Sequence, residues 1–256
     1  MLQAHSFLWH YLWLAPHILQ LVLAFLLCRR GLHRLFPVFL AYAVVEAIEE
    51  FTLYGMDVSP SVSGETFWRT FCVGLVVEGL IKFALIGELA LHLLRPWPAV
   101  ARMGNRLITS SGVVLVLLAT LAAAYAPIDN PDNAIISRAH VLQQTLYIVL
   151  SGLVLFLFVF AAYFKLSWNN LDFGIALGLG ILSCEHLAAW AITASGALPD
   201  QRHLLDFVNL ATYHICVLIW FYYLLIPQQA VTKSAVALPE HNLEMWNREL
   251  ERLLQL

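Results

Sequence analysis

Three glutamates in an otherwise apolar stretch are the first residues of this sequence that could do chemistry. Glu46, Glu49 and Glu50 stand in VVEAIEEF, and the residues before them read LFPVFLAYA from Leu35. In an α-helix, spacings of three and four residues confine the three carboxylates to one arc of about 100°. Such an arc could bind a cation, exchange protons or supply metal ligands.

A second ionisable group lies in FCVGLVVEGLIKFALIGELALHLL, where Glu78, Lys82, Glu88 and His92 share an arc of about 120°. Glu78 and Lys82 are four residues apart in the order that favours an ion pair, so the pair could be purely structural. The alternative is that Lys82 meets the acidic arc of the preceding helix. Glu88 and His92 lie further along, where Arg95 or water could satisfy them.

Polar groups recur in FGIALGLGILSCEHLAAWA. Gly174 and Gly178 form a small-xxx-small face on which another helix can pack closely. Glu185 returns to within about 20° of that face, so we expect it to point into protein and not into lipid. His186 is about 100° away and faces either a neighbouring helix or the edge of the bundle.

The elements that must position these groups are membrane helices. Of the 256 residues, 61% are hydrophobic and 12% charged, against about 45–50% and about 25% in a soluble domain. Stretches of about 20 mostly apolar residues, enough to cross about 30 Å of hydrocarbon, recur along nearly the whole chain. The sequence therefore predicts an all-α polytopic protein with seven spans, at about residues 7–28, 35–54, 67–94, 107–126, 141–164, 173–194 and 205–226.

The distribution of cations predicts the orientation. The loops after the first, third and fifth spans and the tail hold ten Lys or Arg residues: Arg29, Arg30, Arg34, Arg95, Arg102, Arg106, Lys165, Lys233, Arg248 and Arg252. The opposite loops hold three, Arg69, Arg138 and Arg202. Because short cytoplasmic loops carry the excess of Lys and Arg, we predict an outside N-terminus and a cytoplasmic C-terminus. The outer loops are then GMDVSPSVSGET, PIDNPDNA and SGALPDQ.

We predict two regions, a transmembrane domain over residues 1–226 and a cytoplasmic linker with an amphipathic helix over 227–256. In LPEHNLEMWNRELERLLQL, Glu244 and Arg248 form an i,i+4 pair on one face. The other face gathers Leu243, Trp246, Leu250, Leu253 and Leu254. Such a helix either lies on the cytoplasmic lipid surface or docks, over residues 239–256, onto the bundle or onto a cytoplasmic or membrane protein partner.

Depth in the membrane links the polar groups of different spans. At about 1.5 Å per residue, seven ionisable side chains fall between the midplane and the outer third: Glu46, Glu78, Lys82, Glu185, His186, His214 and His17. A charge at mid-bilayer costs about 2.5–3.5 kcal/mol on insertion scales, so these groups should face protein or water. We predict a polar cavity open to the outside, with Lys82 as its one fixed cation. Secondary members are Glu49, Glu50, Gln143 and Asn209.

Two of these predictions compete with simpler interpretations. Glu49 and Glu50 are close enough to the outer interface to reach headgroup water by themselves. A lone histidine in a helix, such as His17 or His214, is more often a packing residue than a ligand.

Three classes of function fit this pattern. The first is a receptor-like sensor or a carrier whose cavity binds a small polar ligand or protons. The second is an intramembrane metal-dependent enzyme, although no HExxH motif occurs and the spacing does not single out a metal site. The third is a structural or assembly subunit of a membrane complex. We favour the first, leave enzymatic activity open and name no catalytic residue, metal or cofactor.

Seven spans also invite a comparison with retinal proteins, which carry a Schiff-base lysine in the seventh helix. The seventh predicted span, LLDFVNLATYHICVLIWFYYLLI, has no lysine, and Lys82 lies in the third. A retinal chromophore is therefore not expected. The lipid bilayer is the expected partner, and nucleic acid is not.

Two segments carry a resemblance to known proteins: RRGLHRLFPVFLAYAVVE in the first inner loop and second span, and LSWNNLDFGIALGLG at the entry to the sixth. Over most of residues 8–226 the chain resembles a group of seven-helix membrane proteins encoded by soil bacteria. That group has arginine soon after the SW dipeptide, where this chain has Asn169 and Asn170. The resemblance implies a multi-pass protein of the bacterial cytoplasmic (inner) membrane. It implies no activity, so no site residue comes from it.

Overall fold

A computed structural model describes the chain except for residues 1–5, 126–133, 167, 195–201, 227–238 and 255–256. The described residues form α-helices and one 3-10 turn, Leu32–Arg34, with no strand among them. The helices are α1 (Phe7–Arg29), α2 (Pro37–Val58), α3 (Gly64–Leu93), α4 (Pro98–Ala124), α5 (Ala134–Tyr163), α6 (Asn170–Ala194), α7 (Arg202–Leu225) and α8 (Pro239–Leu254).

Six of these helices, α1 and α3 to α7, are long and apolar enough to cross a membrane. This set is compatible with a multi-pass integral membrane protein in contact with a lipid bilayer. Helix α2 is not in the set, because Glu46, Glu49 and Glu50 interrupt its apolar residues. Its 22 residues nevertheless span about 33 Å, close to the length of its neighbours.

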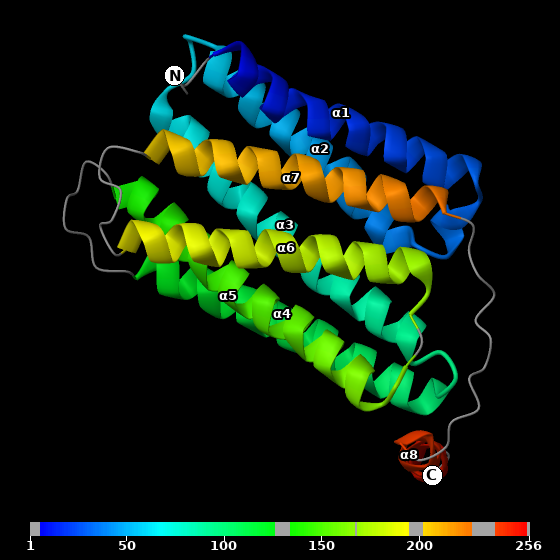
Figure 1. Cartoon of the computed structure of the whole chain (residues 1–256). Coiled ribbons are helices and arrows are strands. Elements are labelled where there is room, and N and C mark those ends of the chain that lie inside the picture. Colours follow the sequence, from blue (N-terminus) through cyan, green and yellow to red (C-terminus); the bar gives the residue numbers. More distant parts are fainter. Residues whose placement is uncertain (1–5, 126–133, 167, 195–201, 227–238, 255–256) are drawn as a thin grey trace.

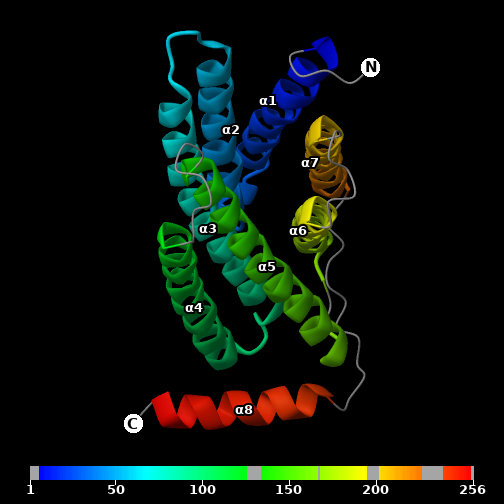
Figure 2. The ribbon, with the colours of Figure 1, turned by 90° about the vertical axis from the view of Figure 1, so that its left-hand side faces the viewer.

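Six helices form a closed ring in the order α1, α2, α3, α5, α6 and α7, with α7 packing back on α1. Helix α4 lies outside the ring against α3 and α5, as Figure 2 shows. Helix α8 lies across one end of the bundle and contacts α4. The opposite end carries the start of α1 and the connection between α2 and α3 (Figure 1). We call these the α8 end and the N-terminal end.

The ring is held together by an apolar core of leucine, alanine and aromatic side chains. Trp220, Tyr42 and Phe39 are fully buried, and the Trp220 ring meets the other two edge-on. On α6, a Cβ at Gly178 would overlap the Trp220 ring, and one at Gly174 would overlap Tyr223. These glycines therefore let α7 approach closely, which confirms the packing predicted for the small-xxx-small face.

Local capping sets several helix ends. The Ser6 hydroxyl accepts from the Trp9 amide at 3.3 Å, and Ser63 caps α3 in the same way. Helix α1 ends at Arg29, and Gly31 adopts a left-handed φ of 71°, a conformation that costs glycine little.

Helices α2 and α4 begin differently. Each has proline in its first turn, and neither Phe36 nor Trp97 at the N-cap offers a side chain that can accept from the first amides. Other helices supply the acceptors. Glu88 of α3 accepts from the amides of Val38 and Phe39 at 2.9 and 3.1 Å, and Asn247 of α8 accepts from the Ala99 amide at 2.9 Å.

Some helices extend beyond the predicted apolar stretches. Helix α4 begins at Pro98 and α5 at Ala134, about two turns before the expected starts at 107 and 141. The added turns of α4 carry the exposed cations Arg102 and Arg106. A helix can continue into water beyond its apolar stretch. The linker 227–238 with Lys233, and most of the loops PIDNPDNA and SGALPDQ, lie outside the described residues, as do the side chains of Arg202, Leu243, Leu250, Leu253 and Leu254.

Candidate functional site

A polar cavity of about 450 Å³ lies inside the ring. Nine of the eleven site residues predicted from the sequence line it, and they come from all six ring helices: His17, Glu46, Glu49, Glu50, Glu78, Lys82, Gln143, His186 and Asn209. The cavity extends to the N-terminal end, where Asp57 of α2 and Asp206 of α7 are exposed. The ring therefore brings most of the predicted polar groups together.

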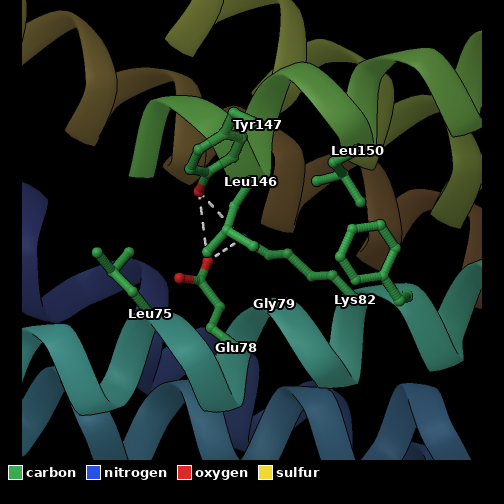
Figure 3. A pocket seen from close by; sticks show the side chains of 8 residues that line it. Leu75, Glu78, Gly79, Lys82, Leu146, Tyr147 and Leu150 are labelled. Atoms are coloured by element: carbon green, nitrogen blue, oxygen red, sulfur yellow. Dashed lines mark hydrogen bonds and ion pairs between the residues drawn. The ribbon is translucent and has the colours of Figure 1, made fainter. Parts of the chain in front are cut away.

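The deepest group joins α3 to α5. Lys82 is 3% exposed and pairs with Glu78, four residues earlier on α3. Its ammonium also donates to the hydroxyl oxygen of Tyr147 at 3.1 Å, and that hydroxyl lies 3.3 Å from the same Glu78 oxygen. Figure 3 shows the three side chains converging between the two helices. The i,i+4 pair therefore exists and is tied to a neighbouring helix.

Glu46 is the most buried carboxylate of the acidic arc. Its side chain faces the cavity and is 8% exposed, yet no hydrogen bond to it is found within the described part of the chain. A buried carboxylate normally has hydrogen-bond partners, because removing it from water is costly. Glu46 therefore presents hydrogen-bonding capacity to whatever occupies the cavity.

The other two glutamates of α2 form part of the cavity wall. Glu50 accepts a hydrogen bond at 2.8 Å from the indole nitrogen of Trp13 on α1. Glu49 lies against Gly74 of α3, where any Cβ would overlap its carboxylate. Both are half-buried and line the cavity. The ring therefore encloses Glu49 and Glu50, for which headgroup water was the alternative surrounding.

A hydrogen-bonded group from α1 and α7 forms the opposite wall. The Gln20 side-chain oxygen accepts from the Tyr213 hydroxyl at 2.8 Å and lies 3.3 Å from His17 Nδ1. The His17 ring stacks on Tyr213 with centroids 4.9 Å apart. These contacts fix His17 as a partnered residue at the cavity surface.

His186 connects α5, α6 and α7. Its ring stacks on Tyr147 with centroids 3.8 Å apart, and its Nε2 lies 3.3 Å from the Asn209 amide nitrogen. Its Nδ1 is 3.0 Å from the Leu182 carbonyl oxygen. These contacts hold the His186 ring between three helices at the cavity surface.

Two predicted residues do not line the cavity. Glu185 follows the face of Gly174 and Gly178, which packs on α7 and does not point to the centre of the ring. Its carboxylate is buried, with one oxygen 3.0 Å from His186 Nδ1. His214 faces Tyr11 of α1, with ring centroids 5.9 Å apart, because Tyr213, one residue earlier, takes the inward position.

The sequence reasoning missed the aromatic part of the lining. Trp9, Trp13, Phe67, Trp68 and Phe71 surround the N-terminal end of the cavity, and Tyr147 reaches its floor. It also missed two acids, Asp57 and Asp206. Asp57 had a readable signal, since it continues the stripe of Glu46 and Glu50 at helical spacing. The tryptophans did not, because aromatic residues gather at membrane interfaces for general reasons.

A separate polar cluster lies toward the α8 end. His92 of α3 is 2.7 Å from Asp172 of α6, and its ring meets Phe36 edge-on. Glu88 lies on the same side of α3 and caps α2. Neighbouring helices, and not Arg95, therefore supply the partners found for Glu88 and His92.

The described residues contain no group of three or more His, Cys, Asp or Glu side chains placed to hold a metal ion. The carboxylates of the cavity are spread along its length and do not converge on one point. Within that part of the chain, the arrangement suits a ligand that spans several groups.

No protein-family model, curated protein or solved structure matches this chain.

Proposed function

We propose that this chain is a seven-span membrane protein whose outward-facing cavity binds a small polar ligand or protons, as a receptor-like sensor or a carrier. The observation that carries the proposal is the common cavity: polar residues from all six ring helices line it. Polar groups inside a membrane are costly and persist where they serve a substrate or proton pathway.

The seventh span in this proposal is α2. Its acidic residues face the cavity, while Ile48 on its other side is 59% exposed. It packs between α1 and α3, both of which are apolar enough to cross the membrane. A helix with charges on the protein side and an apolar side toward lipid can span a bilayer.

The orientation in this proposal follows the Lys and Arg distribution. The α8 end carries Arg29, Arg30 and Arg34 between α1 and α2, and Arg95 and Arg102 around the start of α4. We assign this end to the cytoplasm, which makes the N-terminal end and the cavity mouth face outward. The resemblance to bacterial seven-helix proteins supports the bacterial inner membrane.

Helix α8 then lies at the cytoplasmic surface. Met245 and Trp246 are exposed, and the i,i+4 pair between Glu244 and Arg248 measures 3.9 Å. Exposed apolar side chains beside a charged face suit a helix in the headgroup region. The same surface is available to a cytoplasmic or membrane protein partner.

The experiment compares wild type with Glu46→Gln, which keeps the side-chain shape and removes the ionisable group. Thermal stability of purified protein in nanodiscs is measured across pH and against a panel of small polar solutes. We expect the wild-type melting temperature to depend on pH or on at least one solute, and Glu46→Gln to lose that dependence. Glu65→Gln, at an exposed position on α3 outside the cavity, serves as the control. A wild-type protein that responds to neither would contradict the proposal.

A further inference from the structure

The chemistry of the cavity wall specifies a class of ligand. We propose that the cavity binds a small organic cation of the alkylammonium type. This inference rests on the proposed function, since it names the ligand of the same cavity. Three independent features support it: the balance of charge, the aromatic lining, and the surroundings of the lysine that the cavity already contains.

The first feature is an excess of carboxylates. One lysine, Lys82, lines the cavity. Six carboxylates line it as well: Glu46, Glu49, Glu50, Asp57, Glu78 and Asp206. Lys82 is paired with Glu78, so its charge is already compensated. The remaining acids follow the cavity inward, from exposed Asp57 and Asp206, through half-buried Glu49 and Glu50, to Glu46 at 8% exposure. Acidic groups aligned along a cavity favour the entry of a cation over that of an anion.

Glu46 distinguishes this cavity from a simple cluster of acids. Its carboxylate is more than nine-tenths buried, lines the cavity, and has no hydrogen bond among the described residues. The two nearest carboxylates on the same helix have contacts of their own: Glu50 accepts from Trp13, and Glu49 lies against Gly74. Glu46 is therefore the buried carboxylate of α2 to which a cationic ligand in the cavity would supply a hydrogen-bond partner.

The second feature is the set of rings around the N-terminal end of the cavity. Trp9 and Trp13 meet edge-on at 5.8 Å, and Trp68 meets Phe71 edge-on at 5.4 Å. Aromatic faces attract ammonium groups, with tryptophan the strongest, and they offer nothing to an anion. A divalent metal ion would instead need several converging oxygen or nitrogen ligands. Rings combined with carboxylates therefore favour an organic cation.

The third feature is Lys82 itself. Its ammonium lies 5.0 Å from the ring centroid of Tyr147 and 5.8 Å from that of Tyr42, and it pairs with a carboxylate. Two tyrosine rings and one carboxylate thus already stabilise one alkylammonium group, that of Lys82, in the cavity wall. Glu46, Glu49 and the tryptophans Trp9, Trp13 and Trp68 offer acids and rings of the same kind in the lining of this cavity.

The experiment uses choline as the cationic probe and 3,3-dimethyl-1-butanol as its uncharged isostere. Trp9, Trp13 and Trp68 line the cavity, so intrinsic fluorescence and thermal stability both report occupancy. We expect choline to change the fluorescence and raise the melting temperature of the wild-type protein in maltoside detergent. The isostere at the same concentration should do neither.

Variants assign the effect to the cavity. We expect Glu46→Gln and Trp68→Leu each to weaken choline binding about tenfold, as expected for losing one charge-assisted or cation–π contact. Glu65→Gln removes an exposed acid of α3, and Trp190→Leu removes a half-exposed ring of α6. Both lie outside the cavity lining and should bind choline like wild type.

The source of the ammonium group is tested by reconstitution. If phosphatidylcholine vesicles produce the fluorescence change and phosphatidylglycerol vesicles do not, a lipid headgroup is a ligand, which supports the class and names its source. If only free choline acts, the ligand is a soluble amine.

Equal effects of choline and its isostere, or no effect of choline at all, would overturn this inference. The proposed function would still stand if another solute or pH changes the stability of wild type and Glu46→Gln abolishes that change. Loss of every Glu46-dependent response would overturn both.

Discussion

Lys82 and Glu78 illustrate what a buried ion pair does in this protein. Both side chains are largely buried, and Tyr147 contacts both. Removing one partner of a buried pair leaves the other charge uncompensated, whereas removing both can be nearly neutral. The pair therefore joins α3 to α5, and its contribution to stability depends on both partners being present.

We predict that Lys82→Met lowers the free energy of unfolding by about 3–5 kcal/mol, because Glu78 is left charged and buried. The double variant Lys82→Met with Glu78→Gln should recover much of this loss. Unfolding in mixed detergent micelles measures both. Arg69→Met provides a control on the same helix: its exposed pair with Glu65, at 2.5 Å, should change stability by less than about 1 kcal/mol. A double variant as unstable as the single one would contradict the account.

Glu185 and His214 do not line the cavity, although the sequence predicted that they would. Residue spacing along a helix gives the angle between side chains of that helix, but not the direction in which they point. The spacing of Glu46, Glu49 and Glu50 correctly predicted that they lie on one side of α2, because the angles between them depend on that helix alone. The direction of Glu185 needed a second fact, namely that the face of Gly174 and Gly178 packs on α7. Sequence alone does not say which neighbour a small-residue face meets, so Glu185 was assigned to the cavity although its face packs on α7.

At the scale of elements, α2 and α4 depend on other helices for their N-terminal caps. A carboxylate that accepts from two amides at a helix start also interacts favourably with the helix dipole. Glu88 therefore fixes where α2 begins relative to α3, and so helps to place the acidic stripe of α2 in the cavity. Asn247 ties α8 to the start of α4 in the same manner.

We predict that Glu88→Ala destabilises the protein by about 1–2 kcal/mol, the range for loss of a helix cap with its charge interaction. Glu88→Gln keeps one accepting oxygen and should cost less. Hydrogen exchange of the Val38 and Phe39 amides provides the direct readout, and both should exchange faster in Glu88→Ala. Ser63→Ala, which removes the local cap of α3, should leave those two amides protected. Unchanged exchange in Glu88→Ala would contradict this role.

The length and apolar character of α1 and of α3 to α7 were predictable, because the bilayer requires about 20 apolar residues per span. The N-terminal caps of α2 and α4 were not predictable, because Glu88 lies 49 residues from the Phe39 amide and Asn247 lies 148 residues from the Ala99 amide. The helix starts at Pro98 and Ala134 were missed for a related reason. An apolar stretch ends at the first charged residues, whereas the backbone hydrogen bonds of the helix continue past them.

At the scale of the whole molecule, the ring of six helices and the crossing of α2 are linked. If α2 crosses the membrane, the connection between α1 and α2 and the connection between α2 and α3 lie on opposite sides. We predict that His33→Cys and Ser61→Cys, each in a cysteine-free background, react with a membrane-impermeant maleimide from opposite sides. In intact cells Ser61→Cys should be labelled at once and His33→Cys only after permeabilisation. Labelling of both from one side would contradict the seven-span arrangement.

We propose that the ring encloses a hydrated, acidic cavity that is open to the outside. Leu53 of α2 lines that cavity and is 2% exposed, so Leu53→Cys places a thiol there without removing an acid. Ile48→Cys, on the outward side of the same helix, is the matched control. The measurement is the rate of modification by externally added methanethiosulfonates that carry either a trimethylammonium or a sulfonate group. We expect Leu53→Cys to react, faster with the cationic reagent than with the anionic one, and Ile48→Cys not to react. An unreactive Leu53→Cys, or one that prefers the anionic reagent, would contradict it.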